Sequence, residues 1–188
     1  MQCYRRNAGG LRPRGFTLVE LILVIVMIGI LGAIAGSRYF ARSDFDHSSY
    51  TAQVVGVIRY GQKVAIAQNR AVFVRVDGAG VALCFEAACG VGSRVLAASG
   101  SHSGNNGVIG GVADPCLGDT SWACERVPAG IIFPASGMFW FDALGVPFEL
   151  ADSPTAPSTF VRRDLTVSNG NPASVQHVYV EAQTGYVY

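Results

Sequence analysis

Charged residues are scarce in this sequence, and those present are unevenly placed. Of the 188 residues only 14% are charged, while 50% are hydrophobic, and the formal net charge is +1. The first fifteen residues hold four arginines and no acid, which leaves a net charge of −3 for the rest of the chain. Domains that bind nucleic acids usually carry a basic excess. The charge balance therefore argues against a nucleic-acid-binding domain.

The sequence also lacks the residue groupings that enzymes and metal sites need. It has no Gly-x-Ser-x-Gly motif and no cluster of carboxylates. Its cysteines do not have the two-residue spacing of zinc knuckles. The histidines are isolated from one another: His47, His102 and His177. We therefore expect no catalytic residue, no bound metal and no cofactor, and a structural or binding protein rather than an enzyme.

One apolar run stands out near the N-terminus. Leu21–Gly36 contains no charged residue, and with Phe16–Val19 and Tyr39-Phe40 it reaches about the ~20 residues that a helix needs to cross a bilayer. The basic residues before the run predict a cytoplasmic N-terminus and a domain on the other side of the membrane. The run has no proline, so any bend in its helix would depend on its glycines.

Glu20 is the residue that needs an explanation, because it places a carboxylate beside this run. A secretory signal peptide would account for the basic start, the apolar core and Ala33-Ile34-Ala35 before a cut at Gly36, but not for Glu20. A plain membrane anchor would tolerate Glu20 near the headgroups without giving it a purpose. A charge inside such a segment is by default a functional feature.

The residues around Glu20 resemble the N-terminus of type IV pilins and pseudopilins. A short basic leader ends in Gly15, and "FTLVEL" then opens the apolar helix. The resemblance implies that a prepilin peptidase cuts after Gly15 and methylates Phe16 as the new N-terminal residue. Glu20 would lie one helical turn from that amine, on the same face of the helix. If the amine belongs to a neighbouring subunit, the pair sets the stagger between subunits, which implies a role for Glu20 in assembly.

The chain beyond the apolar run predicts an α+β protein. Apolar residues at helical spacing predict an amphipathic helix over Tyr50–Asn69, whose polar residues, among them Arg59 and Gln62, point away from the apolar face. The polar stretch Arg42–Ser49 could be a kink, a loop or a weak stretch of helix. We expect four divisions: a leader at 1–15, a transmembrane or filament-core half of the helix at 16–40, its amphipathic half at 41–70, and a β-rich head at 71–188.

Alternating apolar segments separated by turn residues predict the strands of the head. Two hairpins are predicted, one from 71–76 and 81–85 and one from 138–141 and 146–150. Two further strands follow at 160–167 and 175–181, and a short last strand follows Thr184-Gly185. The segment Ser99–Gly111 is rich in Gly, Ser and Asn and is predicted to be an exposed loop. The expected architecture is a long helix packed on an antiparallel sheet.

Two groups of residues in the head are candidates for binding surfaces. Phe139 and Phe141 alternate with Trp140 along a strand, so at least one face of this strand is expected to be core, and we favour packing over ligand binding. Arg162-Arg163 could contact an anionic partner such as DNA, but one basic pair in a net acidic domain gives weak support. We expect these arginines to lie on a solvated strand or loop.

The C-terminal half carries a second resemblance. "IIFPASGMFWFDALGVP" and the late "VYVEAQTGYVY" are similar to the GspH/FimT group of minor pilins and pseudopilins. Within that group, the helix "VIRYGQKVAIAQNRAVFVRV" and the cysteine-bearing middle look closest to a minor pilin of the MSHA (mannose-sensitive haemagglutinin) pilus system. The resemblance covers residues 14–76 and 131–188 but not 90–130. It implies the pilin fold.

An exported head would allow its four cysteines to oxidise, and their even number favours two disulfides. Three connectivities are open for four cysteines. We favour the two local pairs, Cys84 with Cys89 and Cys116 with Cys124. Cys3 belongs to the leader.

The resemblances imply a minor pilin that takes part in assembly or initiation of a type IV pilus, of the MSHA type. The implied partners are the prepilin peptidase, the major pilin and other minor pilins, and the inner-membrane assembly platform with its ATPase; nucleic acid is not expected. The implied location is the bacterial inner membrane, single-pass with a cytoplasmic N-terminus and a periplasmic head, and then a pilus or pseudopilus. Two alternatives stay open: an H-type pseudopilin of type II secretion, and a pilus-tip adhesin or DNA-binding minor pilin acting through residues 90–130.

Overall fold

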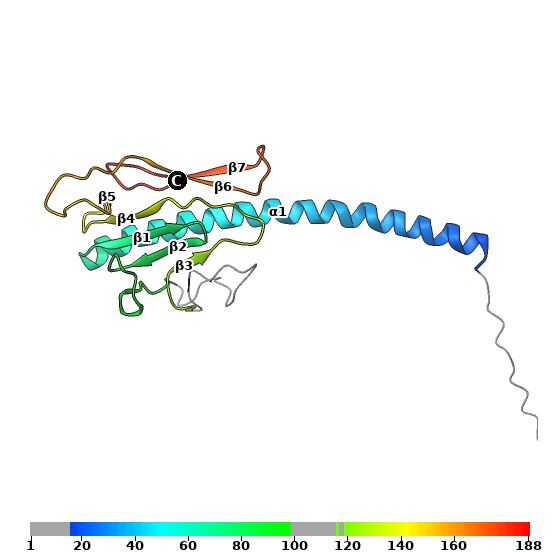
Figure 1. Ribbon diagram of the computed structural model, residues 1–188, viewed down its shortest axis with the longest axis horizontal. Coiled ribbons are helices and arrows are strands. Elements are labelled where there is room, and N and C mark those ends of the chain that lie inside the picture. The colour runs from blue at the N-terminus through cyan, green and yellow to red at the C-terminus, as the bar shows by residue number, and fades with distance from the viewer. Residues whose placement is uncertain (1–15, 99–115, 117–118) are drawn as a thin grey trace, which may run out of the picture. The chain divides into compact units, whose positions relative to one another are not determined.

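The computed structural model describes residues 16–98, 116 and 119–188, with only the backbone described for 34–45 (Figure 1). Gly15, His102 and the predicted loop at 99–111 lie outside the described residues. A single long helix, α1 (Leu18–Gln68), includes the polar stretch at 42–49, so this stretch is helical rather than a loop. Arg42–Tyr188 forms one compact unit, which we call the head unit, and the residues before it form another.

The described strands of the head unit form two antiparallel sheets. The first has five strands in the order β3-β2-β1-β4-β5, and the second pairs β6 with β7. Their bounds are β1 (Val72–Asp77), β2 (Gly80–Cys84), β3 (Cys124–Arg126), β4 (Gly137–Phe141), β5 (Pro147–Glu149), β6 (Arg163–Ser168) and β7 (Val175–Val180), with a 3-10 turn, η1 (Val91–Ser93). The predicted helix on an antiparallel sheet is confirmed, with the strands divided between two sheets.

Both predicted hairpins form, as β1–β2 and β4–β5, and the last short strand is a bridge between Val180 and Val187. Strand β3 was not predicted. It has three residues, too few to show an alternating pattern, and it pairs with β2 through the register Gly80↔Arg126. Ile132 joins the second sheet only through an isolated bridge to Ser168.

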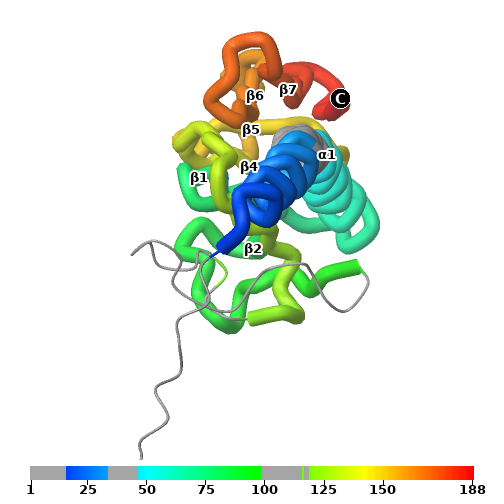
Figure 2. The backbone as a smooth tube through the Cα atoms, turned by 90° about the vertical axis from the view of Figure 1, so that its right-hand side faces the viewer, coloured from blue at the N-terminus to red at the C-terminus, as the bar shows by residue number. Residues whose placement is uncertain are grey.

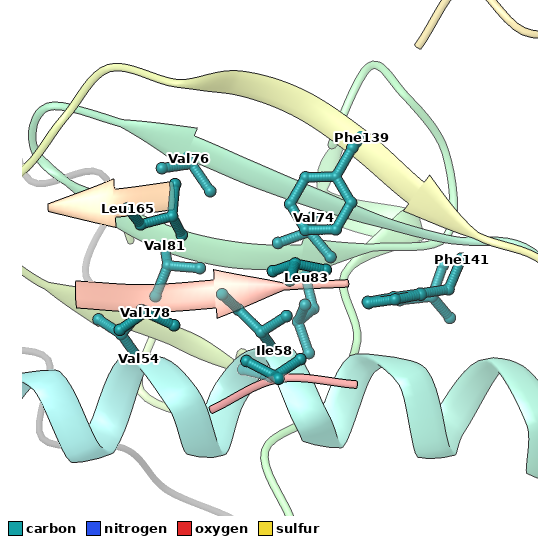
Figure 3. Close-up of a cluster of buried hydrophobic side chains, with 14 of the residues drawn as sticks. Val54, Ile58, Val74, Val76, Val81, Leu83, Phe139, Phe141, Leu165 and Val178 are labelled. Atoms are coloured by element: carbon teal, nitrogen blue, oxygen red, sulfur yellow. The ribbon is translucent and has the colours of Figure 1, made fainter. Parts of the chain in front are cut away.

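The main core lies where α1 meets both sheets. In Figure 3, Val54 and Ile58 of the helix lie among side chains of the five-stranded sheet, such as Leu83, and of the two-stranded sheet, such as Leu165 and Val178. Seen end on, β6 and β7 lie apart from β1 and β2, and the helix runs beside both groups (Figure 2). Each fully buried large apolar side chain contributes ~1.5–3 kcal/mol, so the helix holds the two sheets together.

Strand β4 buries both of its faces. Phe139 and Phe141 are fully buried in the main core, and Trp140 on the opposite face is only 5% exposed. The indole of Trp140 stacks on Phe148 with ring centroids 4.4 Å apart, and its Nε1–H donates to the carbonyl oxygen of Glu149 at 3.0 Å. The prediction that these three aromatic residues serve packing is confirmed.

A second buried cluster contains both disulfides. The bonds join Cys84 to Cys89 and Cys116 to Cys124, the two local pairs. They surround Trp122, which is fully buried and donates from Nε1–H to the carbonyl oxygen of Leu83 at 2.6 Å. This small cluster fixes the cysteine-bearing segment to β2 and β3.

The Arg94 guanidinium covers Trp122 at 4.6 Å from the ring centroid and pairs with Asp119 at 2.7 Å. Hydrogen bonds from Ser121 and then from Arg94 lower the pKa of Asp119 from 3.8 to about 2. Because the folded-state pKa is the lower one, the charged carboxylate stabilises the fold above about pH 4. This contribution is lost as the pH falls toward 2.

We therefore expect Asp119→Asn to lower the free energy of unfolding at pH 5 but to change it little at pH 2. The measurement is urea unfolding of both proteins at a series of pH values. A difference between the two proteins that stays constant from pH 5 to pH 2 would contradict the assigned role of this carboxylate.

Candidate assembly segment at the start of helix α1

Helix α1 is apolar on all sides and exposed over residues 21–33. Every described side chain from 16 to 33 is exposed, and the large apolar side chains from Leu21 to Leu31 are between 43% and 63% exposed. A helix that is apolar all round is normally buried, and an exposed apolar surface of this extent marks an interaction site. This segment therefore requires an apolar environment that comes from outside its own chain.

Within the described side chains, no helix is both long and apolar enough to span a bilayer.

Thr17 caps the start of the helix. Its Oγ1 accepts a hydrogen bond from the backbone N–H of Glu20 at 3.2 Å, while the first helical bond runs from Leu21 N–H to the Thr17 carbonyl at 3.2 Å. Thr17 is thus the N-cap residue and Glu20 the third helical residue, the positions of Thr and Glu in a capping box. Sequence reasoning missed this role, although Thr-x-x-Glu before an apolar run is its signature.

Glu20 has a second local reason to be there, because a carboxylate in the first turn interacts favourably with the helix dipole. Glu20 is exposed, and its carboxylate forms no ion pair with the described residues. Phe16, just before the cap, is 80% exposed. The carboxylate is therefore accessible to a cation from outside the chain, while Gly15 lies outside the described residues.

The two histidines that the structure describes, His47 and His177, form hydrogen bonds within the fold. His47 is buried, and its Nε2–H donates to the carbonyl oxygen of Val167 at 3.0 Å, which joins α1 to β6. His177 lies on the outward side of β7, as expected, where its Nδ1–H donates to the carboxylate of Asp164 at 2.9 Å and its ring stacks on Tyr179. The other ring nitrogen of His47, Nδ1, lies 3.5 Å from the Ser174 hydroxyl, at the outer limit of a hydrogen bond.

The arginine pair at 162–163 does not form one solvated basic site, and the expectation for Arg163 was wrong. The Arg163 guanidinium binds both carboxylate oxygens of Glu149, at 2.7 and 2.8 Å, and covers the rings of Phe139 and Phe160. Arg162 is exposed and lies over Tyr179. Glu149 ends β5 of the first sheet and Arg163 begins β6 of the second, so the ion pair links the two sheets and depends on how they pack, which local sequence could not show.

Polar residues of α1 that lie off its apolar face bind the C-terminal segment, a contact that helical spacing alone did not predict. The amide of Gln62 donates to the carbonyl oxygens of Gly145 and Thr184, each at 2.8 Å. Arg59 donates from Nε to the carbonyl oxygen of Val187 at 2.8 Å. The "FDALG" turn and the closing "TG" turn therefore meet at one point on the helix.

Gln62→Ala is expected to lower the free energy of unfolding by ~2 kcal/mol, because two hydrogen bonds of ~1 kcal/mol each are lost, one part-buried and one exposed. Gln68→Ala, at an exposed position in the same helix, is the matched control and should change stability by less than ~0.5 kcal/mol. Urea unfolding measures both. Equal stabilities of the two variants would contradict the role of Gln62.

Comparison with known proteins places a family motif on the candidate segment. The family described as the prokaryotic N-terminal methylation motif matches residues 11–36. The type IV narrow pilus major component PilA5 of Thermus thermophilus is 36% identical over 62 residues, which are 33% of this chain and 53% of PilA5. Fimbrial protein Q of Moraxella bovis is 47% identical over 49 residues, which are 26% of this chain and 29% of that protein. The chain thus spans about half, or less, of the length of these relatives.

Among solved structures, two crystal forms of the type IV minor pilin FimU of Pseudomonas aeruginosa are similar, with TM-scores of 0.42 and 0.41 and identities of 17% and 16%. The similarity covers 75% of this chain and 85% and 90% of the FimU chains. The N-terminal segment of the chain thus carries the prokaryotic N-terminal methylation motif, and the chain is similar over 62 residues to a component of a type IV pilus.

Proposed function

We propose that this protein is a minor pilin, a structural subunit that takes part in the assembly or initiation of a type IV pilus of the MSHA type. One observation carries the proposal. The methylation motif at residues 11–36 includes the start of a helix whose described side chains at 21–33 are exposed and apolar on all sides. Such a helix is stable only when lipid or other subunits cover it. The resemblance of the C-terminal half to the GspH/FimT group supports a minor rather than a major subunit.

In this proposal the prepilin peptidase cleaves after Gly15 and methylates Phe16. Before assembly the apolar half of the helix, residues 16–40, is held in the bacterial inner membrane, with the head in the periplasm. The platform and its ATPase then move the subunit into a filament with the major pilin and other minor pilins. Neighbouring subunits replace lipid around the helix, so the same apolar surface serves both states.

Glu20 determines the position at which a subunit docks on its neighbour in the filament. Thr17 already caps the helix, so the exposed carboxylate of Glu20 can accept an ammonium group without loss of the helix start. An unpaired carboxylate in an apolar surrounding is costly, and an amine from the neighbouring subunit relieves that cost only in one stagger. We infer that the pair fixes the position of each new subunit.

The proposal is tested by deleting the gene and expressing a tagged copy. We expect the deletion to reduce surface filaments and leave type II secretion unchanged, and the tagged protein to be recovered in sheared filaments in small amounts relative to the major pilin. Normal filaments together with a loss of type II secretion would instead indicate an H-type pseudopilin and would overturn the proposal.

A further inference from the structure

A cavity of about 280 Å³ opens on the head unit, on the face of the five-stranded sheet opposite the main core. Phe73 of β1 and Trp140 of β4 form part of its wall, and Leu150 and Asp152, which follow β5, form another part. Its remaining lining residues are two alanines and a proline. The cavity is therefore almost wholly apolar, with a single carboxylate.

The aromatic wall belongs to a row of rings that crosses three strands. Phe73, Trp140 and Phe148 are register partners on β1, β4 and β5, with centroid distances of 6.1 Å and 4.4 Å between neighbours. The indole N–H of Trp140 already donates to Glu149, so it has no hydrogen bond left to offer. Trp140 is only 5% exposed and lies between Phe148 and Phe73, so these residues give the cavity an apolar aromatic wall that suits methyl and methylene groups.

The carboxylate of Asp152 is held in place by its own loop. Its Oδ2 accepts from the backbone N–H groups of Glu149 and Thr159, each at 2.9 Å, and its Oδ1 accepts from the Thr159 hydroxyl at 2.6 Å. These bonds, chiefly those from Thr159, keep the pKa of Asp152 below its usual range. It forms no ion pair with the described residues, so its negative charge is uncompensated.

We propose that this cavity binds an alkylammonium group, that is, a positively charged nitrogen carrying methyl groups or an alkyl stem. The aromatic wall of Phe73 and Trp140 contacts the alkyl part, and the carboxylate of Asp152 attracts and neutralises the charge. An anionic ligand would meet a carboxylate, and a neutral apolar ligand would leave that charge without a partner. The site lies on the head and does not depend on processing at Gly15, so it goes beyond the function proposed above.

The first test compares two ligands of the same shape, choline and its neutral isostere 3,3-dimethyl-1-butanol. The full chain is kept in dodecyl maltoside micelles, whose head group is uncharged, and the indole N–H signals of its two tryptophans are followed by NMR; Trp140→Phe assigns them. We expect choline to shift the Trp140 signal, to leave that of buried Trp122 unchanged, and to bind about tenfold more tightly than the isostere. Equal binding of the two ligands would overturn the proposal.

The second test changes the site. Asp152→Asn should remove the preference for choline over its isostere. Because this variant could also disturb the loop, Leu150→Lys offers an independent route: it places a tethered ammonium at the cavity and should prevent choline binding. Leu144→Lys, at an exposed apolar position outside the cavity lining, is the matched control and should bind choline normally. Unchanged choline binding by Leu150→Lys would overturn the proposal.

A third comparison separates two sources of the group. N-acetyl-lysine-N-methylamide carries the primary ammonium of a lysine side chain, as a protein partner would present it, whereas choline carries the quaternary ammonium of small metabolites and lipid headgroups. Tighter binding of either one identifies the source, and both results support an alkylammonium site. Failure of both ligands at low salt would overturn it.

Discussion

Glu20→Gln is expected to leave helix α1 intact and to lower the incorporation of the subunit into filaments by about tenfold or more. Glutamine can occupy the third position of a capping box as glutamate does, so Thr17 still caps the helix. It cannot form an ion pair with the amine of a neighbouring subunit. In an apolar filament core the amine would then stay unpaired, at a cost of several kcal/mol. The measurement is the amount of tagged subunit in sheared filaments relative to the membrane fraction.

Two companion variants separate the charge of Glu20 from its place in the helix cap. Glu20→Asp keeps the charge on a shorter side chain and should retain part of the incorporation. Thr17→Ala removes the cap, which costs ~1 kcal/mol of helix stability, but leaves the charge. We expect both to assemble better than Glu20→Gln. Normal incorporation of Glu20→Gln together with failure of Thr17→Ala would show that Glu20 serves the helix cap and not the contact between subunits.

Gly185→Ala is expected to lower the free energy of unfolding of the head unit by ~3 kcal/mol. Gly185 has a positive φ of 62°, which costs an alanine ~1 kcal/mol. Its added Cβ would also clash with the backbone oxygen of Gly145 and lie 2.6 Å from the amide nitrogen of Gln62. Backbone cannot rotate away as a flexible side chain can, so the junction that joins α1 to both turns must open.

Gly170→Ala is the matched control for this prediction. Gly170 also has a positive φ, 83°, but its Cβ would meet nothing within 4 Å. This variant should lose only ~1 kcal/mol. Urea unfolding of the two variants beside the original protein gives both values. If Gly185→Ala were no less stable than Gly170→Ala, the close approach of the two turns at Gln62 would be disproved.

Local patterns in the sequence predicted most of the elements. Helical spacing from Val54 onward gave the amphipathic part of α1, and turn residues between apolar segments gave both hairpins, because each of these signals lies within a few neighbouring residues. The two disulfides could be proposed because an even number of cysteines falls in a domain that was expected to be exported. The Thr-x-x-Glu signature of the N-cap at Thr17 also lies within a few neighbouring residues, but the cap was identified only from the structure.

Contacts between distant segments could not be predicted in this way. Gln62 reads as a solvent-facing residue of an amphipathic helix, and only the fold brings Gly145 and Thr184 to it. The sequence shows Arg163 only as half of a basic pair, and the packing of the two sheets places Glu149 beside it. The division of the strands into two sheets depends in the same way on which faces α1 covers. The spacing of apolar residues along α1 does not show which strands will pack against which side of the helix.

The central claim, that this chain is processed and assembled as a pilin, is tested most directly by mass spectrometry of its mature N-terminus. The protein should be purified from cells with and without the prepilin peptidase. We predict a chain that begins with methylated Phe16 in the first case and one that retains the residues before it in the second. A mature chain that begins at Gly36, or one that is identical in both strains, would contradict the account.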